Sequence, residues 1–284
     1  MISIIICSRK KSIDSNLDLN IHKTIGCDYE LIVINNSRSN YSIFEAYNKG
    51  IKESKGEFLC FIHDDILIQT KDWGKKIIRI FETDNKIGLI GIAGSKIKTK
   101  MPSSWSDCDE KYKVINVIQH FNDANPQKME CGFRENKTIE EVVAIDGVFI
   151  AARKIKGLIF NTNLKGFHNY DLSISLDFKI KGFRNIVTNE ILIEHFSLGT
   201  IDKSWYESAL KLDELYKKHL PLSTDEFVSK KNINNRELIN GAAFVSQLFK
   251  YGYIKQAFKY WIKLVLIKPY SKYHFILLKK AFKF

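Results

Sequence analysis

The sequence predicts an α/β protein, with a mostly parallel sheet flanked by helices and a basic helical segment at its C-terminal end. Through the first hundred residues, short apolar runs rich in β-branched residues alternate with segments whose apolar residues recur at helical spacing. The runs are apolar at successive positions, as in strands that are buried on both faces of a parallel sheet. Positive charge, in contrast, gathers in residues 230–284.

The first hundred residues supply most strands of that sheet and the helices between them. Residues 42–54 and 73–81 have helical spacing, and Asp72 is placed to cap the second of these helices. Strands joined by such helices run parallel through right-handed crossovers, and ligands bind beyond their carboxyl ends. The expected strands are residues 3–7, 29–35, 57–62 and 87–93.

The following residues are less regular. Between Lys96 and Lys137 the sequence is polar and contains scattered aromatic residues, which predicts a long irregular insertion of the kind that forms lids and substrate loops. An apolar segment at 142–154 comes next, and then a helix that ends at Gly182, a residue suited to a left-handed helix stop. Residues 185–196 are expected to form one last strand.

The net charge of +12 is distributed unevenly along the chain. Residues 230–284 hold 12 Lys/Arg and a single acid, Glu237, whereas the rest of the chain carries 32 Lys/Arg against 31 Asp/Glu. This shift predicts a boundary near Ser229, with a main domain over 1–229 and a basic helical tail over 230–284 that is broken at Pro269. The nearly neutral body argues against a nucleic-acid partner, because backbone tracking requires basic residues spread over the body.

The cysteines and the lengths of the apolar runs indicate where in the cell the protein is expected. The five cysteines are odd in number and lack metal-ligand spacing, which indicates a reducing compartment without a disulfide framework. The N-terminus MISIIICS lacks the basic region and long apolar stretch of a signal peptide, and no run approaches the roughly 18 apolar residues of a membrane span. We therefore expect a cytoplasmic protein, or one that is peripheral on the inner face of a membrane.

The segment FIHDDI carries the strongest chemical signal. An apolar strand ends there in His63, Asp64 and Asp65, which sets an imidazole and two carboxylates at the mouth of the sheet. Charged groups there are costly unless they bind a partner, and this ligand set suits Mn²⁺ or Mg²⁺ held to a diphosphate. Alternation along the strand end directs His63 and Asp65 to one side and Asp64 to the other. A solvated acidic pair without a ligand is the alternative.

The order of these elements resembles the family-two-like glycosyltransferases of the GT-A fold, which have a Rossmann-like sheet and a D-x-D element that holds metal and nucleotide diphosphate. The matching segments are a strand ending in Ser-Arg, a strand ending in Asn-Asn-Ser, KGEFLCFIHDDI, GLIGIAG, IDGVFIAARK, FHNYDL and EHFSLGT. They cover about residues 2–200. The chain is most similar to the branch in which histidine replaces the first aspartate of the motif, giving H-x-D.

This resemblance implies a role for each matching position. His63 and Asp65 would hold the metal, with Asp64 between them, and His195 would complete the metal shell. Asp171 would be the catalytic base of an inverting transfer, because it matches the acid that takes the acceptor's proton. The positions matching the donor and acceptor pockets are Ser8, Arg9 and Asp146.

Asn35 or Asn36 stands where the family usually has an acid that contacts the base or ribose, so the nucleotide stays open. UDP, the family's commonest donor nucleotide, is favoured. The resemblance implies transfer of a sugar, a hexose in most such enzymes, from a nucleoside-diphosphate sugar to a hydroxyl of a glycan or lipid-linked acceptor. The expected setting is the synthesis of a bacterial surface polysaccharide.

Other interpretations remain open at this stage. Asp171 could cap the helix that follows it, His195 could be a hydrogen-bonded core residue, and Arg9 could be solvated. The whole chain could be a catalytically silent relative or a basic protein that binds membranes or nucleic acid. A nucleotidyltransferase is the second enzymatic alternative, although CSRKKSID lacks the glycine-rich phosphate loop of that class.

The basic tail predicts contact with an anionic membrane surface. Its lysines recur every four residues on one side of a helix, largely away from the bulky apolar residues. Such a helix can lie in a membrane interface, whereas packing on the body or a dimer contact is the alternative. The residues concerned are Lys255, Phe258, Lys259, Trp261, Lys263 and Val265.

Overall fold

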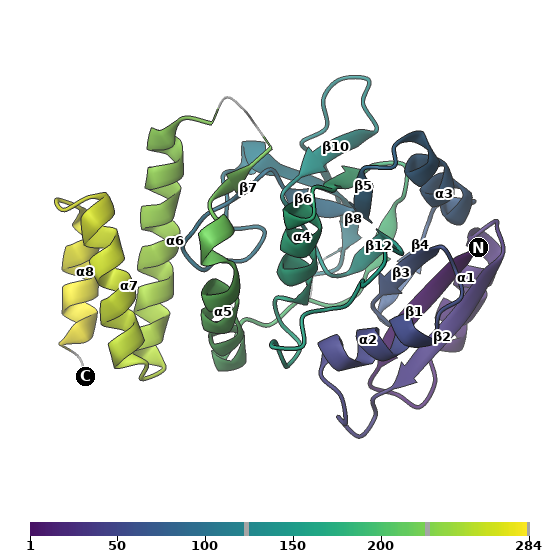
Figure 1. The fold of residues 1–284 in the computed structure, drawn as a ribbon, viewed down its shortest axis with the longest axis horizontal. Helices are drawn as coiled ribbons and strands as arrows, with labels where there is room; N and C mark the ends of the chain where they lie inside the picture. The colour runs from purple at the N-terminus through teal and green to yellow at the C-terminus, as the bar shows by residue number, and fades with distance from the viewer. Residues whose placement is uncertain (122–124, 225–227, 283–284) are drawn as a thin grey trace.

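A seven-stranded sheet forms the centre of the protein, in the order β10-β13-β5-β12-β3-β1-β2 (Figure 1). The computed structural model describes residues 1–121, 125–224 and 228–282. Strands β1, β2, β3, β5 and β13 run in one direction, and β12 and β10 run against them, so the predicted mostly parallel sheet is confirmed. The strands are β1 (Ile2–Ser8), β2 (Tyr29–Asn35), β3 (Phe58–Ile62), β5 (Ile87–Gly91), β10 (Ile139–Val142), β12 (Phe149–Arg153) and β13 (Arg184–Thr188).

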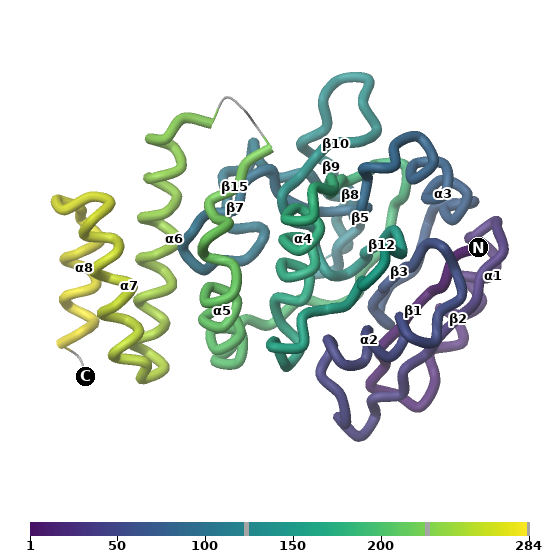
Figure 2. Tube along the Cα trace, in the orientation of Figure 1, coloured from purple at the N-terminus to yellow at the C-terminus, as the bar shows by residue number. Residues whose placement is uncertain are grey.

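Helices cover both faces of this sheet, as the continuous apolar strands require (Figure 2). Ile4 and Ile6 of β1 face the layer of α1 and α3, which contains Trp73. Ile5, between them, faces the opposite layer of α2, α4 and α5 and packs in the cluster of Tyr47. The helices are α1 (Ser15–Thr24), α2 (Ile43–Glu53), α3 (Trp73–Thr83), α4 (Tyr170–Ile180) and α5 (Lys203–Tyr216).

Local signals explain where several helices begin and end. Ser42 and Glu45 form a capping box at the start of α2, in which each side chain binds the other residue's backbone N–H. Gly182, at φ +82°, ends α4 as predicted. Asp72 does stand at the start of α3, but its backbone is left-handed and its side chain makes no capping hydrogen bond. Its carboxylate pairs with Lys75 instead, so the predicted capping role is wrong.

The predicted irregular insertion between Lys96 and Lys137 is wrong in part of the range that the structure describes, because residues 113–119 and 127–131 form strands of a second sheet, whereas residues 99–109 are irregular as expected. That sheet has the order β11-β6-β8-β14-β4, with β9 paired to β8. Polar residues such as the buried Asn116 interrupt the apolar pattern of β8, and every residue of β9 is exposed, so neither gave a periodic signal. Its strands are β4 (Ile66–Ile68), β6 (Ala93–Ser95), β8 (Lys113–Gln119), β9 (Gln127–Cys131), β11 (Ala144–Ile145) and β14 (Ile193–His195); β7 (Ile97–Lys98) and β15 (Leu222–Ser223) pair separately.

The expected single strand at 185–196 is also wrong, because the chain passes there from one sheet to the other. Residues 184–188 belong to the central sheet, and residues 193–195 belong to the second sheet. Asn116 holds the crossing by donating from its side-chain amide to the carbonyl oxygens of Asn189 and Ile191, at 3.2 and 2.8 Å. This crossing carries His195 away from the central sheet and toward β4.

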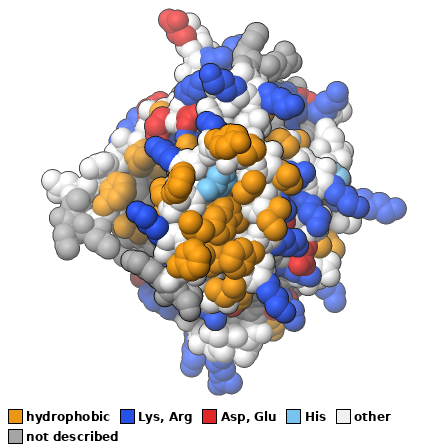
Figure 3. Space-filling model, turned by 90° about the vertical axis from the view of Figure 1, so that its left-hand side faces the viewer, with side chains coloured by type: hydrophobic (Ala, Val, Ile, Leu, Met, Phe, Trp, Pro, Cys, Tyr) orange, Lys and Arg blue, Asp and Glu red, His pale blue; other side chains and the backbone are white. Residues whose placement is uncertain are grey.

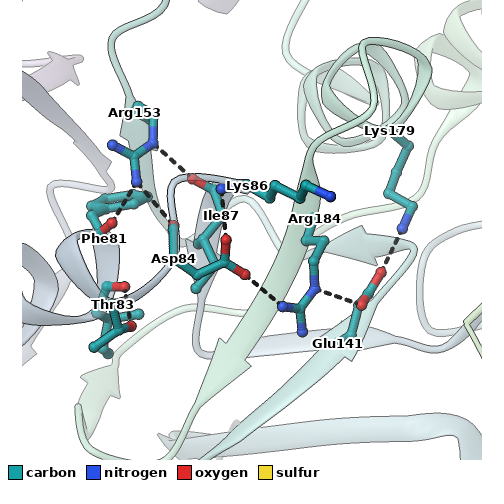
Figure 4. Close-up of polar contacts among 10 residues, drawn as sticks. Phe81, Thr83, Asp84, Lys86, Ile87, Glu141, Arg153, Lys179 and Arg184 are labelled. Carbon is teal, nitrogen blue, oxygen red and sulfur yellow. Dashed lines mark hydrogen bonds and ion pairs between the residues drawn. The ribbon is translucent and has the colours of Figure 1, made fainter.

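A polar network lies at one end of the central strands, where β12 ends and β5 begins (Figure 4). Arg153 donates to the carbonyl oxygens of Phe81 and Asp84 at the end of α3 and to that of Ile87. These are carbonyls at and beyond a helix end, which lack partners within the helix. Arg184 then links the Asp84 carboxylate, at 2.7 Å, to Glu141 on β10, at 2.8 Å. The network ties α3 to four strands, β5, β10, β12 and β13.

Three helices form the tail, namely α6 (Lys230–Lys250), α7 (Ile254–Ile267) and α8 (Lys272–Ala281). The predicted break at Pro269 is confirmed, and Gly252, at φ +80°, makes a second break. Helix α6 begins at the predicted boundary with Ser229 as its N-cap. It shares an apolar cluster with α5 and Met101, so the tail packs against the body, and its status as a separate domain stays a prediction.

Glu237 is the main polar anchor of the tail. This buried carboxylate accepts hydrogen bonds from the backbone N–H groups of Lys100 and Met101, at 2.5 and 2.7 Å. Three residues further along α6, Asn240 donates to Thr99 Oγ1 at 3.0 Å and to the carbonyl oxygen of Asp107 at 2.9 Å. The loop after β7 is thus fastened to one turn of α6.

We expect Glu237→Ala to lower the free energy of unfolding by about 2–4 kcal/mol, because two buried N–H groups lose a charged acceptor. Urea denaturation followed by circular dichroism measures the change. Asn235→Ala, at an exposed position of the same helix, is the matched control and should change stability by less than about 0.5 kcal/mol. Equal effects of the two substitutions would contradict the anchoring role.

Candidate active site

The carboxyl ends of β1, β2 and β3 lie side by side, because β1 pairs in parallel with both neighbours. Ser8, the last residue of β1, is buried and donates from Oγ to Asp64 Oδ2 at 2.6 Å. Asp64 therefore points toward the end of β1, on the opposite side from His63 and Asp65. Arg9 follows Ser8 and is exposed. The structure thus brings Ser8 and Asp64 together at this edge.

The two asparagines after β2 differ in their surroundings. Asn36 is buried, and its side-chain amide both donates to the carbonyl oxygen of Tyr41 at 2.8 Å and accepts from the Tyr41 N–H at 3.0 Å. Asn35 is exposed and accepts hydrogen bonds from Ser37. Asn36 therefore holds the loop in shape, whereas Asn35 is open to a ligand.

Three side chains converge beyond the end of β3. The turn between β3 and β4 carries His63 and Asp65, and the antiparallel pairing of β4 with β14 sets His195 opposite Ile66. His63 Nδ1 lies 3.6 Å from Asp65 Oδ1, and His195 Nε2 lies 3.7 Å from the same oxygen. One ligand atom from each residue lies within 4.8 Å of the others, so the three atoms could share one ion.

The polar contacts of this group fit a divalent metal. Asp65 Oδ1 and His195 Nε2 are buried and have no hydrogen-bond partner within the part of the chain that the structure describes. Burying such atoms unpaired costs free energy, so both atoms are poised for a ligand. Two imidazole nitrogens and one carboxylate oxygen form a set that Mn²⁺ accepts, with open positions left for other oxygens.

Two neighbouring side chains orient the imidazoles so that His63 Nδ1 and His195 Nε2 face Asp65 Oδ1. His195 Nδ1 lies 3.0 Å from Gln119 Oε1, an acceptor, which leaves the lone pair of His195 on Nε2. His63 Nε2 lies 2.7 Å from the hydroxyl of Tyr170, on the side away from Asp65. Outer contacts of this kind fix the tautomer and the ring orientation of metal-binding histidines.

The protonation states of Asp65 and His195 also suit metal ligands. Burial acts to raise the pKa of Asp65, but contacts with the side chains of His63 and Ser197 outweigh it, so the pKa lies below its usual range. Burial lowers the pKa of His195. The carboxylate is therefore ionised and the imidazole neutral near pH 7, as metal binding requires.

Asp171 lies in the first turn of α4, one residue after the Tyr170 that contacts His63. Asn169 occupies the N-cap position of this helix, so the alternative that Asp171 is the cap is wrong. Burial and the negative charge of Asp146 outweigh a hydrogen bond from the Leu172 N–H and raise the pKa of Asp171 to about 7. A carboxyl group with this pKa can exchange a proton near neutral pH.

Gly147 allows α4 to approach the histidine. A Cβ atom on this glycine would lie 2.2 Å from the Tyr170 hydroxyl oxygen, a severe clash with the atom that contacts His63. The preceding Asp146 accepts a hydrogen bond from Trp105 Nε1 at 2.8 Å. Asp146 thus positions Trp105, and Gly147 leaves room for Tyr170.

A cavity of about 230 Å³ adjoins His195 and Asp146. Sequence reasoning missed most of its walls, because they come from the second sheet and the loop before it. Apart from Asp146 and His195, only the predicted lid or substrate insertion pointed to this region. The side chains that line it are Ile92, Ala93, Trp105, Ser106, Lys113, Ile115, Val117, Gln119, Met129, Asp146, Val148 and His195.

Comparisons with solved structures agree with this architecture. GalNAc-T7, solved with UDP, GalNAc and Mn²⁺, matches with a TM-score of 0.50 at 12% identity, over 83% of this chain and 54% of its own. The chain thus spans about half the length of that structure. The mannosyltransferase PcManGT from Pyrobaculum calidifontis, solved with GDP-Man and Mn²⁺, matches with a TM-score of 0.50 at 11% identity, over 99% of this chain and 84% of its own. At these identities the matches show a shared GT-A fold.

Sequence comparisons give the family. Over 196 residues the chain is 20% identical to the ATP synthase subunits region ORF 6 of Fuscovulum blasticum, which covers 68% of this chain and 73% of that protein. The model described as "Glycosyltransferase like family" matches residues 3–226, well over half of the chain. The chain therefore belongs to the glycosyltransferase-like family of enzymes.

Proposed function

We propose that this enzyme transfers a sugar from a nucleoside-diphosphate sugar to a hydroxyl group, with inversion at the anomeric carbon. One observation carries the proposal: the unpartnered buried atoms of Asp65 and His195 lie beside His63, which touches the residue preceding Asp171. A cation site and a carboxyl group with a pKa of about 7 thus adjoin one another. Residues 1–229 would form the catalytic unit.

His63, Asp65 and His195 would hold the divalent metal, Mn²⁺ in preference to Mg²⁺ because two of the three ligands are nitrogen. The metal would neutralise the charge that develops on the departing diphosphate. Both TM-score 0.50 neighbours were solved with Mn²⁺, which supports this choice. Since histidine replaces the first acid of the motif, we expect weak metal binding until the diphosphate supplies its own oxygens.

The donor nucleotide would lie over the carboxyl ends of β1 and β2. Arg9 and Asn35 are exposed there and could contact phosphate and ribose, whereas Asn36 is engaged with Tyr41. Ser8 and Asp64 would shape the pocket through their mutual hydrogen bond. UDP leads as the nucleotide, and GDP is the alternative, in line with the ligands of the two neighbours.

Asp171 would act as the catalytic base. Its carboxylate would take the proton of the acceptor hydroxyl while that oxygen forms a bond to the anomeric carbon and the bond to the diphosphate breaks. The pKa of about 7 supports this role, because such a base is both largely ionised and basic enough at neutral pH.

The acceptor would enter through the cavity beside Asp146. Trp105 and Met129 offer apolar surface there, and Lys113 and Gln119 offer polar groups, which is the mixed lining that sugar rings require. We therefore favour a glycan or lipid-linked acceptor. Synthesis of a bacterial surface polysaccharide is the setting that fits such an acceptor.

Asp65→Asn should weaken Mn²⁺ binding at least about tenfold, because the amide removes the charge that the ion needs. Electron paramagnetic resonance of free Mn²⁺, with and without UDP, measures this affinity without any acceptor. Asp64→Asn is the matched control, since Asp64 lies in the same turn but pairs with Ser8. If Asp64→Asn lost Mn²⁺ and Asp65→Asn kept it, the proposed ligand set would be wrong.

Asp171→Asn should lower the rate of nucleoside-diphosphate release about 10²–10⁴-fold, because the base is removed. The assay uses water as acceptor and whichever UDP- or GDP-sugar stabilises the protein in a thermal-shift panel. Donor affinity should be unchanged. The wild-type rate should fall as the pH drops through about 7, since protonation of Asp171 removes the base. A pH-independent rate, or full activity of the variant, would exclude this role.

A stability measurement separates loss of the base from loss of the fold. The pKa of Asp171 is higher in the folded chain than in the unfolded chain, where it is near 3.8. The unfolded chain ionises Asp171 above about pH 4, whereas the folded chain keeps it neutral up to about pH 7. The buried carboxyl group therefore destabilises the fold progressively from about pH 4 and fully above about pH 7. Asp171→Asn should accordingly stabilise the protein at pH 8, by about 2–4 kcal/mol, and this gain should disappear near pH 4.

A further inference from the structure

The outer side of the tail carries an apolar surface. Helices α7 and α8 pack in the tail's apolar cluster through Ala257, Leu264 and Leu277, and their other sides lie open. Figure 3 shows hydrophobic side chains gathered on this face of the molecule, with lysines and arginines around them. Leu266 is 80% exposed, Phe275 72% and Phe282 82%. Six of the exposed apolar side chains are called the tail face below, namely Phe258, Ile262, Leu266, Tyr270, Phe275 and Phe282.

The tail face is preformed, because side chains lock α7 to α8. Trp261 Nε1 donates to His274 Nδ1 at 3.1 Å, and the other ring nitrogen of His274 contacts the carbonyl oxygen of Lys268 at 2.8 Å. Trp261 also stacks on Phe258, with ring centroids 5.9 Å apart. The two helices and their link therefore present one fixed surface, and a partner need not order it.

The charge around the tail face has a single sign. Residues 251–284 contain eight lysines and no acidic residue. Lys263 reaches Asp213 on α5, at 3.6 Å. Within the described residues, no carboxylate pairs with the remaining lysines of α7, the link and α8. These lysines are Lys255, Lys259, Lys268, Lys272, Lys279 and Lys280, of which Lys280 donates to the Ser246 hydroxyl.

We propose that the tail face binds the surface of an anionic lipid bilayer. The exposed aromatic and aliphatic side chains would enter the boundary between headgroups and acyl chains, and the surrounding lysines would meet lipid phosphates. A second copy of the chain fits less well, because two such faces would oppose two sets of lysines without an acid between them. The partner of the tail face should therefore carry negative charge to match the lysines as well as an apolar region to receive the exposed side chains.

The same helices are suited to lie on the bilayer and not to cross it. Helix α7 has 14 residues and α8 has 10, whereas a span requires about 20. No helix of the described residues is both long enough and apolar enough to cross a membrane. An in-plane position would leave the body, with its site at the ends of β1–β3, in the aqueous phase.

Vesicle sedimentation of the full chain tests the proposal. We expect binding to vesicles of phosphatidylcholine mixed with phosphatidylglycerol, little binding to phosphatidylcholine alone, and weaker binding at high salt. Leu266→Ser/Phe275→Ser should reduce binding at least about tenfold, because it removes two of the most exposed apolar anchors. Leu19→Ser/Ile180→Ser, at exposed apolar positions of the body, is the matched control and should bind as the wild type does.

Both double variants should keep the wild-type melting temperature and its shift with Mn²⁺ and UDP, which separates this proposal from the proposed reaction. Equal vesicle binding by Leu266→Ser/Phe275→Ser and the wild type would overturn the proposal. So would a wild-type dimer in sedimentation velocity that binds no vesicles and becomes monomeric in that variant, because the occupant would then be a second copy.

Discussion

The site depends on one pairing, between the short strands β4 and β14. It joins residues about 130 positions apart and sets the His195 imidazole against Asp65, at the point where the central sheet gives way to the second sheet. Burial then leaves Asp65 Oδ1 and His195 Nε2 without a hydrogen-bond partner in the described chain, which is unfavourable unless a cation joins them. The antiparallel ladder therefore brings two distant polar residues into one candidate metal site.

Helix α4 couples that site to the candidate base. Tyr170 touches His63 from the first turn of the helix, and Asp171 follows it directly. The approach is close enough that only glycine fits at position 147. A shift of α4 would therefore move His63 and the Asp171 carboxyl group together. On the other side, Gln119 of β8 contacts the His195 ring and holds its orientation.

Sequence reasoning predicted β1, β2, β3 and β5, because their long apolar runs leave few alternatives; β1, β3 and β5 are buried, and β2, at the edge of the sheet, is half-buried. It also grouped His63, Asp65 and His195, although through a resemblance, since nothing local relates residue 63 to residue 195. It missed β8 and β9, where Asn116 breaks the apolar pattern and β9 is wholly exposed. Most of the cavity wall and Gln119, which contacts His195, were missed for the same reason, because they come from that sheet.

A crystal of the protein with Mn²⁺ and UDP, measured at the manganese absorption edge, tests the central claim most directly. We predict one anomalous peak about 2.0–2.3 Å from each of His63 Nδ1, Asp65 Oδ1 and His195 Nε2, in contact with the diphosphate. The three atoms already lie close enough together to share an ion. Bound UDP with manganese beside Asp64, or with no manganese at all, would contradict the account.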